Sequence, residues 1–211
     1  MLSPEQLLAF LAAATLITAS PGPDNLMVLG VGMSRGRRQG MVFGLGCALG
    51  CLTHTLLATV GVSALLAASP LAFTALKVAG ALYLVWLGIG ALRSRGGAKV
   101  AGTGELANET LGRLFAKGLF ANSINPKVVL FFLTFLPQFV LTAPGSGSAS
   151  WQTAQLGLVF TAQACVLFGL LGYFSGAIGQ WINQRPRAGL WLDRVAGAIF
   201  IGLGLRLLLV R

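Results

Sequence analysis

The chain of 211 residues is 55% hydrophobic and only 9% charged, a composition that excludes an ordinary soluble domain of this length. Its net charge of +10 is concentrated in short basic stretches, so it indicates membrane topology rather than a surface for nucleic acid. No nucleotide-binding loop, catalytic triad or paired metal motif occurs in the sequence, so we expect neither an enzyme nor a bound cofactor or metal. The expected class is a membrane protein.

Three stretches without charged residues, 6–23, 39–76 and 128–184, contain the expected membrane spans. Since about 20 apolar residues cross a bilayer, each of the two longer stretches must hold more than one helix. Turn signals divide them at "AASPLAF", centred on Pro70, and at "TAPGSGSAS", 142–150. The prediction is an all-α membrane protein with six transmembrane helices, at about 5–33, 39–67, 70–93, 112–141, 151–181 and 188–209.

The motif "SPGPDN" interrupts the first expected helix. Two prolines flank Gly22, and each removes a backbone N–H and collides with the preceding turn, so a continuous helix is not expected. Asp24 is the only acidic residue deep in an expected span, and an intramembrane carboxylate is costly unless it is paired, solvated or protonated. It is either a simple helix cap or, as we favour, a ligand for a proton or a substrate ammonium. The residues of this motif assigned to a substrate and proton site are Pro21, Pro23, Asp24 and Asn25.

The second expected helix carries small and sulfur-containing residues that allow two interpretations. Cys47, Cys51 and His54, at positions i, i+4 and i+7, share one face and either hold a soft metal or pack tightly against a neighbour. Close packing is also expected from glycines in this helix and in "GYFSG" at 172–176 of the fifth helix. The glycines concerned in and before the second helix are Gly36, Gly40, Gly44, Gly46 and Gly50.

Lys77 and Tyr83 lie on the third expected helix and are also assigned to the site. Lys77 is one to two turns from the outer end of the helix, where a snorkelling side chain is the simpler interpretation. Tyr83 lies deeper in "KVAGALYLVWLG", and it either lines a substrate path or packs at a helix seam.

The motif "NSINPKVV" interrupts the fourth expected helix. Asn125 suits the N-cap and Pro126 the first position of a new half-helix, whose free backbone N–H groups favour an anion. Lys127 is the basic residue inside this charge-poor helix. It forms either a structural ion pair with Asp24 or, in the functional interpretation, part of a site for a substrate carboxylate. We therefore assign Asn125, Pro126 and Lys127 to the substrate and proton site as well.

Three expected helices precede the basic segment 94–112 and three follow it, which predicts repeats over 1–93 and 113–211 joined by a linker. An odd number of spans in each half inverts the second half in the membrane, and the first helix of each half is the broken one. Paired broken spans of this kind point to the binding site of a transporter. The basic loops are expected on the cytoplasmic side, with both termini outside.

Four stretches of the sequence, "SPGPDN", "GRRQGMVFGLGCALG", "KVAGALYLVWLGIGALR" and "FANSINPKVVLFFLTFLPQF", resemble the LysE/RhtB family of bacterial amino-acid exporters in order and spacing. The resemblance covers nearly the whole chain. It implies a bacterial inner-membrane protein with inverted three-helix halves, a homodimer, that expels amino acids such as threonine, homoserine, lysine or leucine at the expense of the proton gradient. The family's broken-helix motifs fall on residues 20–25 and 125–127.

Alternating access of the two halves around Asp24 is the leading mechanism, and two other functions remain open. A metal-cation exporter of similar architecture requires several inward ligands, for which only Cys47, Cys51 and His54 qualify. A membrane thiol-disulfide electron carrier requires cysteines beside the broken helices, and those helices contain none.

Overall fold

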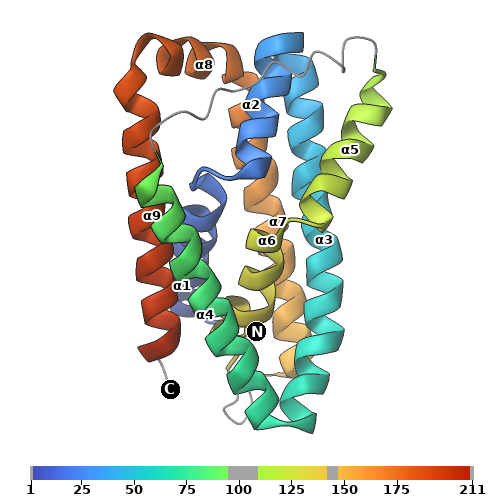
Figure 1. Ribbon diagram of the computed structural model, residues 1–211. Coiled ribbons are helices and arrows are strands. Elements are labelled where there is room, and N and C mark those ends of the chain that lie inside the picture. The colour runs from blue at the N-terminus through green and yellow to red at the C-terminus, as the bar shows by residue number, and fades with distance from the viewer. Residues whose placement is uncertain (1, 95–108, 142–146, 210–211) are drawn as a thin grey trace.

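The computed structural model of the chain describes residues 2–94, 109–141 and 147–209, which form an elongated bundle of helices (Figure 1). All regular secondary structure in these three segments is helical, as predicted. Most of the expected linker, residues 95–108, lies outside the described residues.

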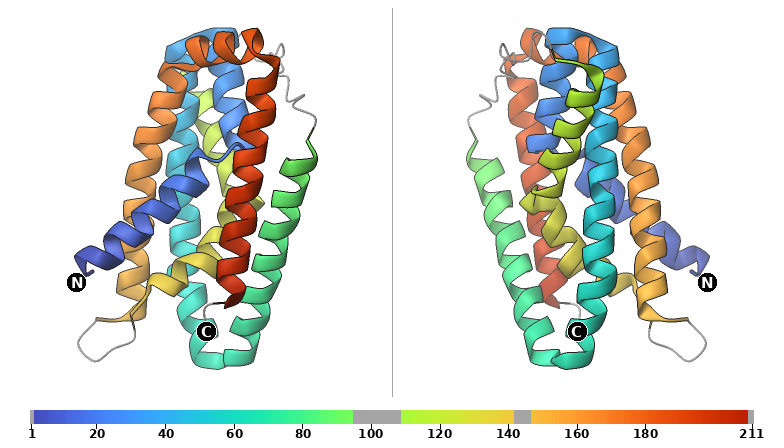
Figure 2. Two further views of the ribbon diagram at one scale, coloured as in Figure 1. Left: turned by 90° about the vertical axis from the view of Figure 1, so that its left-hand side faces the viewer. Right: turned by 90° about the vertical axis from the view of Figure 1, so that its right-hand side faces the viewer.

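The first broken helix consists of α1 (Pro4–Ala19) and α2 (Pro23–Arg35), which meet at an angle of 57°. Ser3 and Gln6 form a capping box at the start of α1, in which each side chain accepts a hydrogen bond from the other residue's backbone N–H. The break lies in "SPG", where the sequence predicts it. Because of this bend, α1 leans out of the bundle, whereas α2 runs along the bundle (Figure 2).

Two long helices, α3 (Arg37–Ala68) and α4 (Pro70–Arg93), follow and run in opposite directions. Gly36 joins α2 to α3 with a φ of 100°, a conformation that favours glycine. Only Ser69 separates α3 from α4, which confirms the turn predicted at Pro70.

The second broken helix also divides where the sequence predicts, with a bend of 49°. Its second part is irregular, because a short α-helix passes into a π-helix and then into a 3₁₀-helix that contains Pro137. The elements are α5 (Leu111–Ser123), α6 (Pro126–Leu130), η2 (Phe131–Phe135) and η3 (Leu136–Phe139).

The prediction of a single fifth helix over 151–181 is wrong. Instead, α7 (Ala149–Tyr173) ends at Phe174, and α8 (Ser175–Gln184) turns across the end of the bundle (Figure 1). The last helix, α9 (Pro186–Leu209), then runs back beside α4.

Close local contacts surround the turn between α7 and α8. The Ser175 hydroxyl donates to the carbonyl of Gly172 at 2.7 Å, and a Cβ at Gly172 would lie 2.5 Å from backbone atoms of Gly40 and Met41 in α3. The turn at Phe174 thus follows directly on a close contact between α7 and α3. Beyond the turn, α8 exposes both polar Gln180 and the large ring of Trp181, a mixture typical of a helix at the membrane surface.

Glycines set the closest helix contacts, as the sequence predicts for most of them. Gly40 faces α2, Gly44 faces α7, and Gly46 and Gly50 face α5, each so closely that a Cβ would overlap the neighbouring backbone. An equivalent contact that the sequence analysis missed joins α4 to α9. There, a Cβ at either Gly88 or Gly197 would lie 2.7 Å from the carbonyl oxygen of the other.

The two broken helices run in opposite directions through the bundle: α1 and α2 lead toward the end that carries α8, and α5 to η3 lead away from it (Figure 1). The end that carries α8, which we call the basic end, holds Arg37, Arg38, Arg185 and Arg187. The opposite end, where α1 begins and α9 stops, we call the terminal end.

Three helices are long and apolar enough to cross a membrane, namely α3, α4 and α7 in the parts 37–61, 74–93 and 149–173. Each bent pair adds one broken span, which gives up to five among the described residues. With 24 residues, α9 is about 36 Å long and accompanies α4 along the bundle. The chain is a multi-pass helical membrane protein.

Candidate functional site

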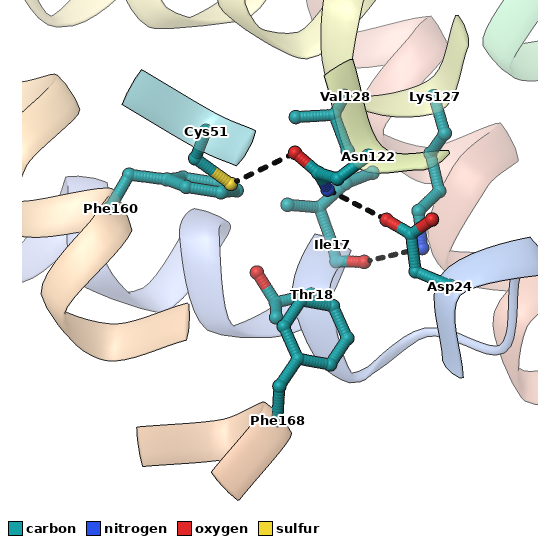
Figure 3. A pocket seen from close by; sticks show the side chains of 9 residues that line it. All are labelled: Ile17, Thr18, Asp24, Cys51, Asn122, Lys127, Val128, Phe160 and Phe168. Carbon is teal, nitrogen blue, oxygen red and sulfur yellow. Dashed lines mark hydrogen bonds between the residues drawn. The ribbon is translucent and has the colours of Figure 1, made fainter. Parts of the chain in front are cut away.

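The two helix breaks lie next to each other inside the bundle, and polar side chains from both broken helices meet there (Figure 3). Asp24 is in the first turn of α2 and only 1% exposed. Its Oδ2 accepts a hydrogen bond from Nδ2 of Asn122 in α5 at 2.7 Å. Its Oδ1 is buried and has no hydrogen-bond partner among the described residues. The interpretation of Asp24 as the helix cap is wrong, because Gly22 holds the N-cap position.

Lys127 approaches the first break from α6 and is 5% exposed. Its Nζ donates to the carbonyl oxygens of Ile17 at 3.1 Å and Ser20 at 3.0 Å, at the carboxyl end of α1. It forms no direct ion pair with Asp24, since the salt bridge found among the described residues joins Lys117 to Glu109. The Lys127 ammonium thus lies at the carboxyl end of α1, the negative end of its dipole. The Asp24 carboxylate lies at the amino end of α2, the positive end, so helix dipoles stabilise both charges.

The second break has the cap that the sequence predicts. Asn125 occupies the N-cap of α6, its Oδ1 accepts from the Lys127 backbone N–H at 3.0 Å, and Pro126 is at the first helical position. The backbone N–H of Asn125 donates to the carbonyl of Asn122 at 2.9 Å, so the short connection closes on itself.

Polar atoms around the first break are only partly paired. Asn25 donates from Nδ2 to the Thr18 carbonyl at 2.9 Å, and Gln163 of α7 donates to the Thr18 hydroxyl at 2.8 Å. In contrast, Ser20 Oγ, Asn25 Oδ1 and Asn125 Nδ2 are buried without a partner among the described residues. Buried polar atoms without partners are uncommon in folded proteins, and they mark positions where water or a ligand binds.

A cavity of about 10 Å³ lies between Asp24, Asn122, Lys127 and Phe168 (Figure 3). This volume accommodates about one water molecule and no amino acid. Larger grooves, of about 180 and 220 Å³, open between the first break, α7 and α8, and both include Asn25 in their walls. The space around the breaks therefore widens toward the basic end.

Toward the terminal end, the bundle is tightly filled. Aromatic rings of α1, η2, η3 and α7 pack against one another with ring centroids 4.9 to 6.2 Å apart. Below them, Gln6 donates to the Phe139 carbonyl and, at 3.1 Å, to Gln152, which also bonds both backbone groups of Leu141. We call these rings the aromatic plug: Phe10, Phe131, Phe132, Phe135, Phe139 and Phe160.

Two of the assigned residues lie away from the breaks. Tyr83 packs its ring against Trp86 of the same helix, with centroids 5.5 Å apart, and it lines none of the cavities described above. Lys77 is in the second turn of α4, near the terminal end. The other seven assigned residues belong to the two breaks or the turns that follow them.

The face of α3 that carries Cys51 and His54 contacts Asn122. The Cys51 thiol donates to Asn122 Oδ1 at 3.4 Å, and His54 Nε2 lies 2.9 Å from the Asn122 carbonyl, so this nitrogen must carry the proton. No group of three His, Cys, Asp or Glu side chains that could hold a metal occurs in the described part of the chain. The three cysteines, including Cys47 and Cys165, are free thiols.

Asn122 is the central residue that the sequence analysis did not assign. It is fully buried and binds Asp24, Cys51 and His54. One feature of the sequence could have identified Asn122. It is a carboxamide within an apolar span, three residues before the predicted N-cap, and polar side chains inside a membrane require partners.

Two broken helices that enter from opposite ends and meet at buried charged groups define a membrane transporter by architecture. The chain belongs to the LysE type translocator family, whose model matches residues 15–211.

Relatives in this family align over nearly their whole length. The chain is 33% identical over 197 residues to the threonine efflux protein of Escherichia coli (strain K12), covering 91% of this chain and 92% of that protein. It is 32% identical over 199 residues to the homoserine/homoserine lactone efflux protein of Salmonella typhimurium, covering 93% and 92%. It is 30% identical over 205 residues to the leucine efflux protein of Salmonella choleraesuis, covering 94% and 92%. No solved structure matches the chain.

Proposed function

We propose that this protein is a secondary active exporter of amino acids, with Asp24 at the centre of its transport cycle. The observation that carries the proposal is the buried Asp24 carboxylate, of which one oxygen is unpaired, at the meeting point of two broken helices. The efflux proteins named above give the substrate class. The proposed substrate and proton site comprises Pro21, Pro23, Asp24, Asn25, Asn125, Pro126 and Lys127.

Alternating access is the proposed mechanism, with the repeats 1–93 and 113–211 moving against each other around the breaks. The grooves toward the basic end and the aromatic plug toward the terminal end support a conformation open to one side only. Opening the plug requires η2 and η3 to move, and π- and 3₁₀-helical turns are common at such hinges. A cavity that holds one water molecule then has to widen for a substrate to pass.

Proton coupling is proposed to act through Asp24. A proton on Oδ1 removes a buried charge and supplies a donor where none exists, while Oδ2 keeps its bond from Asn122. Deprotonated Asp24 binds a substrate ammonium instead, so proton and substrate occupy the same carboxylate in turn.

The basic end is proposed to face the cytoplasm of the cell membrane, with both termini outside, because basic loops stay on the cytoplasmic side. A homodimer, implied by the family resemblance, completes the proposal. Cysteine labelling at the two ends of the bundle from either side of the membrane tests the orientation, and cross-linking in the membrane tests the dimer.

Efflux from proteoliposomes tests the central claim. Vesicles that contain the full chain are loaded with labelled threonine, homoserine or leucine, and release is followed with and without a pH gradient. We expect Asp24→Asn to slow release at least about 100-fold, because the asparagine side chain cannot exchange a proton and carries no charge to bind an ammonium. Glu109→Gln, in a surface ion pair with Lys117, serves as the control. Release by Asp24→Asn at the wild-type rate with the same pH dependence would contradict the proposal.

A further inference from the structure

The groove of about 180 Å³ toward the basic end combines an apolar wall with two polar groups. It lies between the first break, α7, α8 and α9. We call it the entry groove, and its wall includes Asn25, Leu26, Leu29, Ile178, Leu192 and Asp193. Its wall extends from Ile178 of α8 to Pro21 and Asn25 of the first break.

Both polar groups of the entry groove offer oxygen acceptors. Asn25 is 8% exposed, its Nδ2 is bound to the Thr18 carbonyl, and its Oδ1 has no partner among the described residues. Asp193 accepts from the Ser94 hydroxyl at 2.6 Å through Oδ2, and a carboxylate can accept several hydrogen bonds at once. A ligand that donates hydrogen bonds and carries a positive charge satisfies both groups.

The rest of the wall consists of aliphatic side chains. Leu26 and Leu29 come from α2, Ile178 from α8 and Leu192 from α9. Among the described residues, no Lys or Arg lines the groove. A second carboxylate on a ligand therefore meets Asp193 without a cation to balance it, and a second ammonium meets an apolar wall, so both acidic and basic side chains are disfavoured.

Together, these features specify a ligand. We propose that the entry groove is the first binding site for substrate and that it selects neutral amino acids with aliphatic side chains. The α-ammonium binds Asp193 and Asn25 Oδ1, and the side chain lies against the aliphatic wall. The α-carboxylate remains in water at the mouth of the groove. This inference rests on the proposed export function, because it assigns a recruitment step to the same broken helix that carries Asp24.

Transport kinetics of the reconstituted full chain test the inference with the series alanine, 2-aminobutyrate and norvaline, which lengthens the side chain one methylene at a time. In the wild type, we expect KM to fall about fourfold per methylene. Asp193→Asn should raise KM about tenfold for all three while preserving their ratios, because the ammonium loses a charged partner. The asparagine still accepts from Ser94, so the fold is retained. Ile178→Asn should instead flatten the ratios.

Glu5→Gln removes the same charge at an exposed position of the terminal end and should leave KM unchanged. If Asp193→Asn keeps KM within twofold of the wild type while Asp24→Asn blocks transport, the groove is no substrate site and only this inference is overturned. A groove that holds a lipid chain gives that same result. If the folded wild-type protein transports no amino acid, the proposed function fails, and this inference fails with it.

Discussion

Each helix break leaves backbone groups at the helix ends without partners, and the two breaks satisfy these groups in different ways. At the second break, most of the caps are local: the Asn125 backbone N–H donates to the Asn122 carbonyl, which also accepts from His54 of α3, and the Asn125 side chain caps α6. At the first break, Lys127 from the other half of the chain binds the carbonyls of Ile17 and Ser20. A break that is capped locally can move as a unit, whereas a break capped from elsewhere changes whenever the two halves separate.

This difference suggests how movement is coupled to binding. As long as Lys127 caps α1, the first break is closed and the cavity beside Asp24 remains small. If the halves rock, Lys127 leaves the α1 carbonyls, and those oxygens become acceptors for a substrate ammonium near Asp24. Breaking and re-forming these two hydrogen bonds is the step that distinguishes the two conformations in the proposed cycle.

The largest effect is expected from Lys127→Met, which keeps an unbranched side chain, one atom shorter, but removes the ammonium. The Ile17 and Ser20 carbonyls lose their donor, and Asp24 loses the cation buried nearby. Unfolding should become easier by about 3 kcal/mol, the size of a charged hydrogen bond, and efflux should be lost. Melting followed by circular dichroism in detergent, together with proteoliposome efflux, measures both.

Lys117→Met is the matched control, since Lys117 is half exposed and paired with Glu109 at the surface. It should change neither melting nor efflux noticeably. Equal melting temperatures for the two variants would show that the first break does not depend on Lys127.

The positions of both breaks and the cap at Asn125 could be predicted because they follow from short-range chemistry. Proline and glycine break a helix, and Asn followed by Pro starts one, wherever the segment lies in the fold. The partner of Lys127 could not be predicted, because its long side chain reaches a carbonyl or a carboxylate according to distances that only the packed bundle sets. Charge alone favoured an ion pair between Lys127 and Asp24, yet the Lys127 ammonium binds the α1 carbonyls.

The second largest effect is expected from Gly50→Ala, which alters the locally capped break. A Cβ at Gly50 would lie 2.8 Å from both the Leu119 carbonyl oxygen and the Cβ of Asn122, neither of which can move away freely. We expect a loss of about 2 kcal/mol from overpacking and a displaced Asn122. Because Asn122 holds Asp24, efflux should slow as well.

Gly61→Ala provides the control in the same helix, because no atom lies within 4 Å of a Cβ at that position. The alanine should leave stability unchanged or raise it slightly through its better helix propensity. A Gly50→Ala protein as stable as Gly61→Ala would mean that α3 and α5 do not pack closely at Gly50.

The turn at Phe174 and the role of Asn122 could not be predicted, because both involve contacts between helices that are distant in the sequence. Residues 151–181 are apolar enough to continue as one helix, yet the chain turns at Phe174, next to the contact of Gly172 with Gly40 of α3. Asn122, in turn, is one of several polar residues in its motif, and its importance comes from three partners on two other helices. Long-range contacts of this kind leave no periodic pattern in the sequence.

The smallest effect is expected from Gly22→Ala at the first break. The φ of Gly22 is −164°, which alanine adopts without strain, but its Cβ would lie 2.8 Å from Lys127 Nζ. The flexible ammonium can shift at little steric cost, so stability should fall by less than about 1 kcal/mol while efflux slows, because the α1 carbonyls are capped less well.

A double-mutant cycle shows whether this effect passes through Lys127. In the Lys127→Met background the clash with Nζ is absent, so Gly22→Ala should have no further effect on melting. If the two substitutions instead add, Gly22 matters for the backbone of the break itself. The first break would then be as self-contained as the second, and uncapping by Lys127 could not be the step that links the two halves.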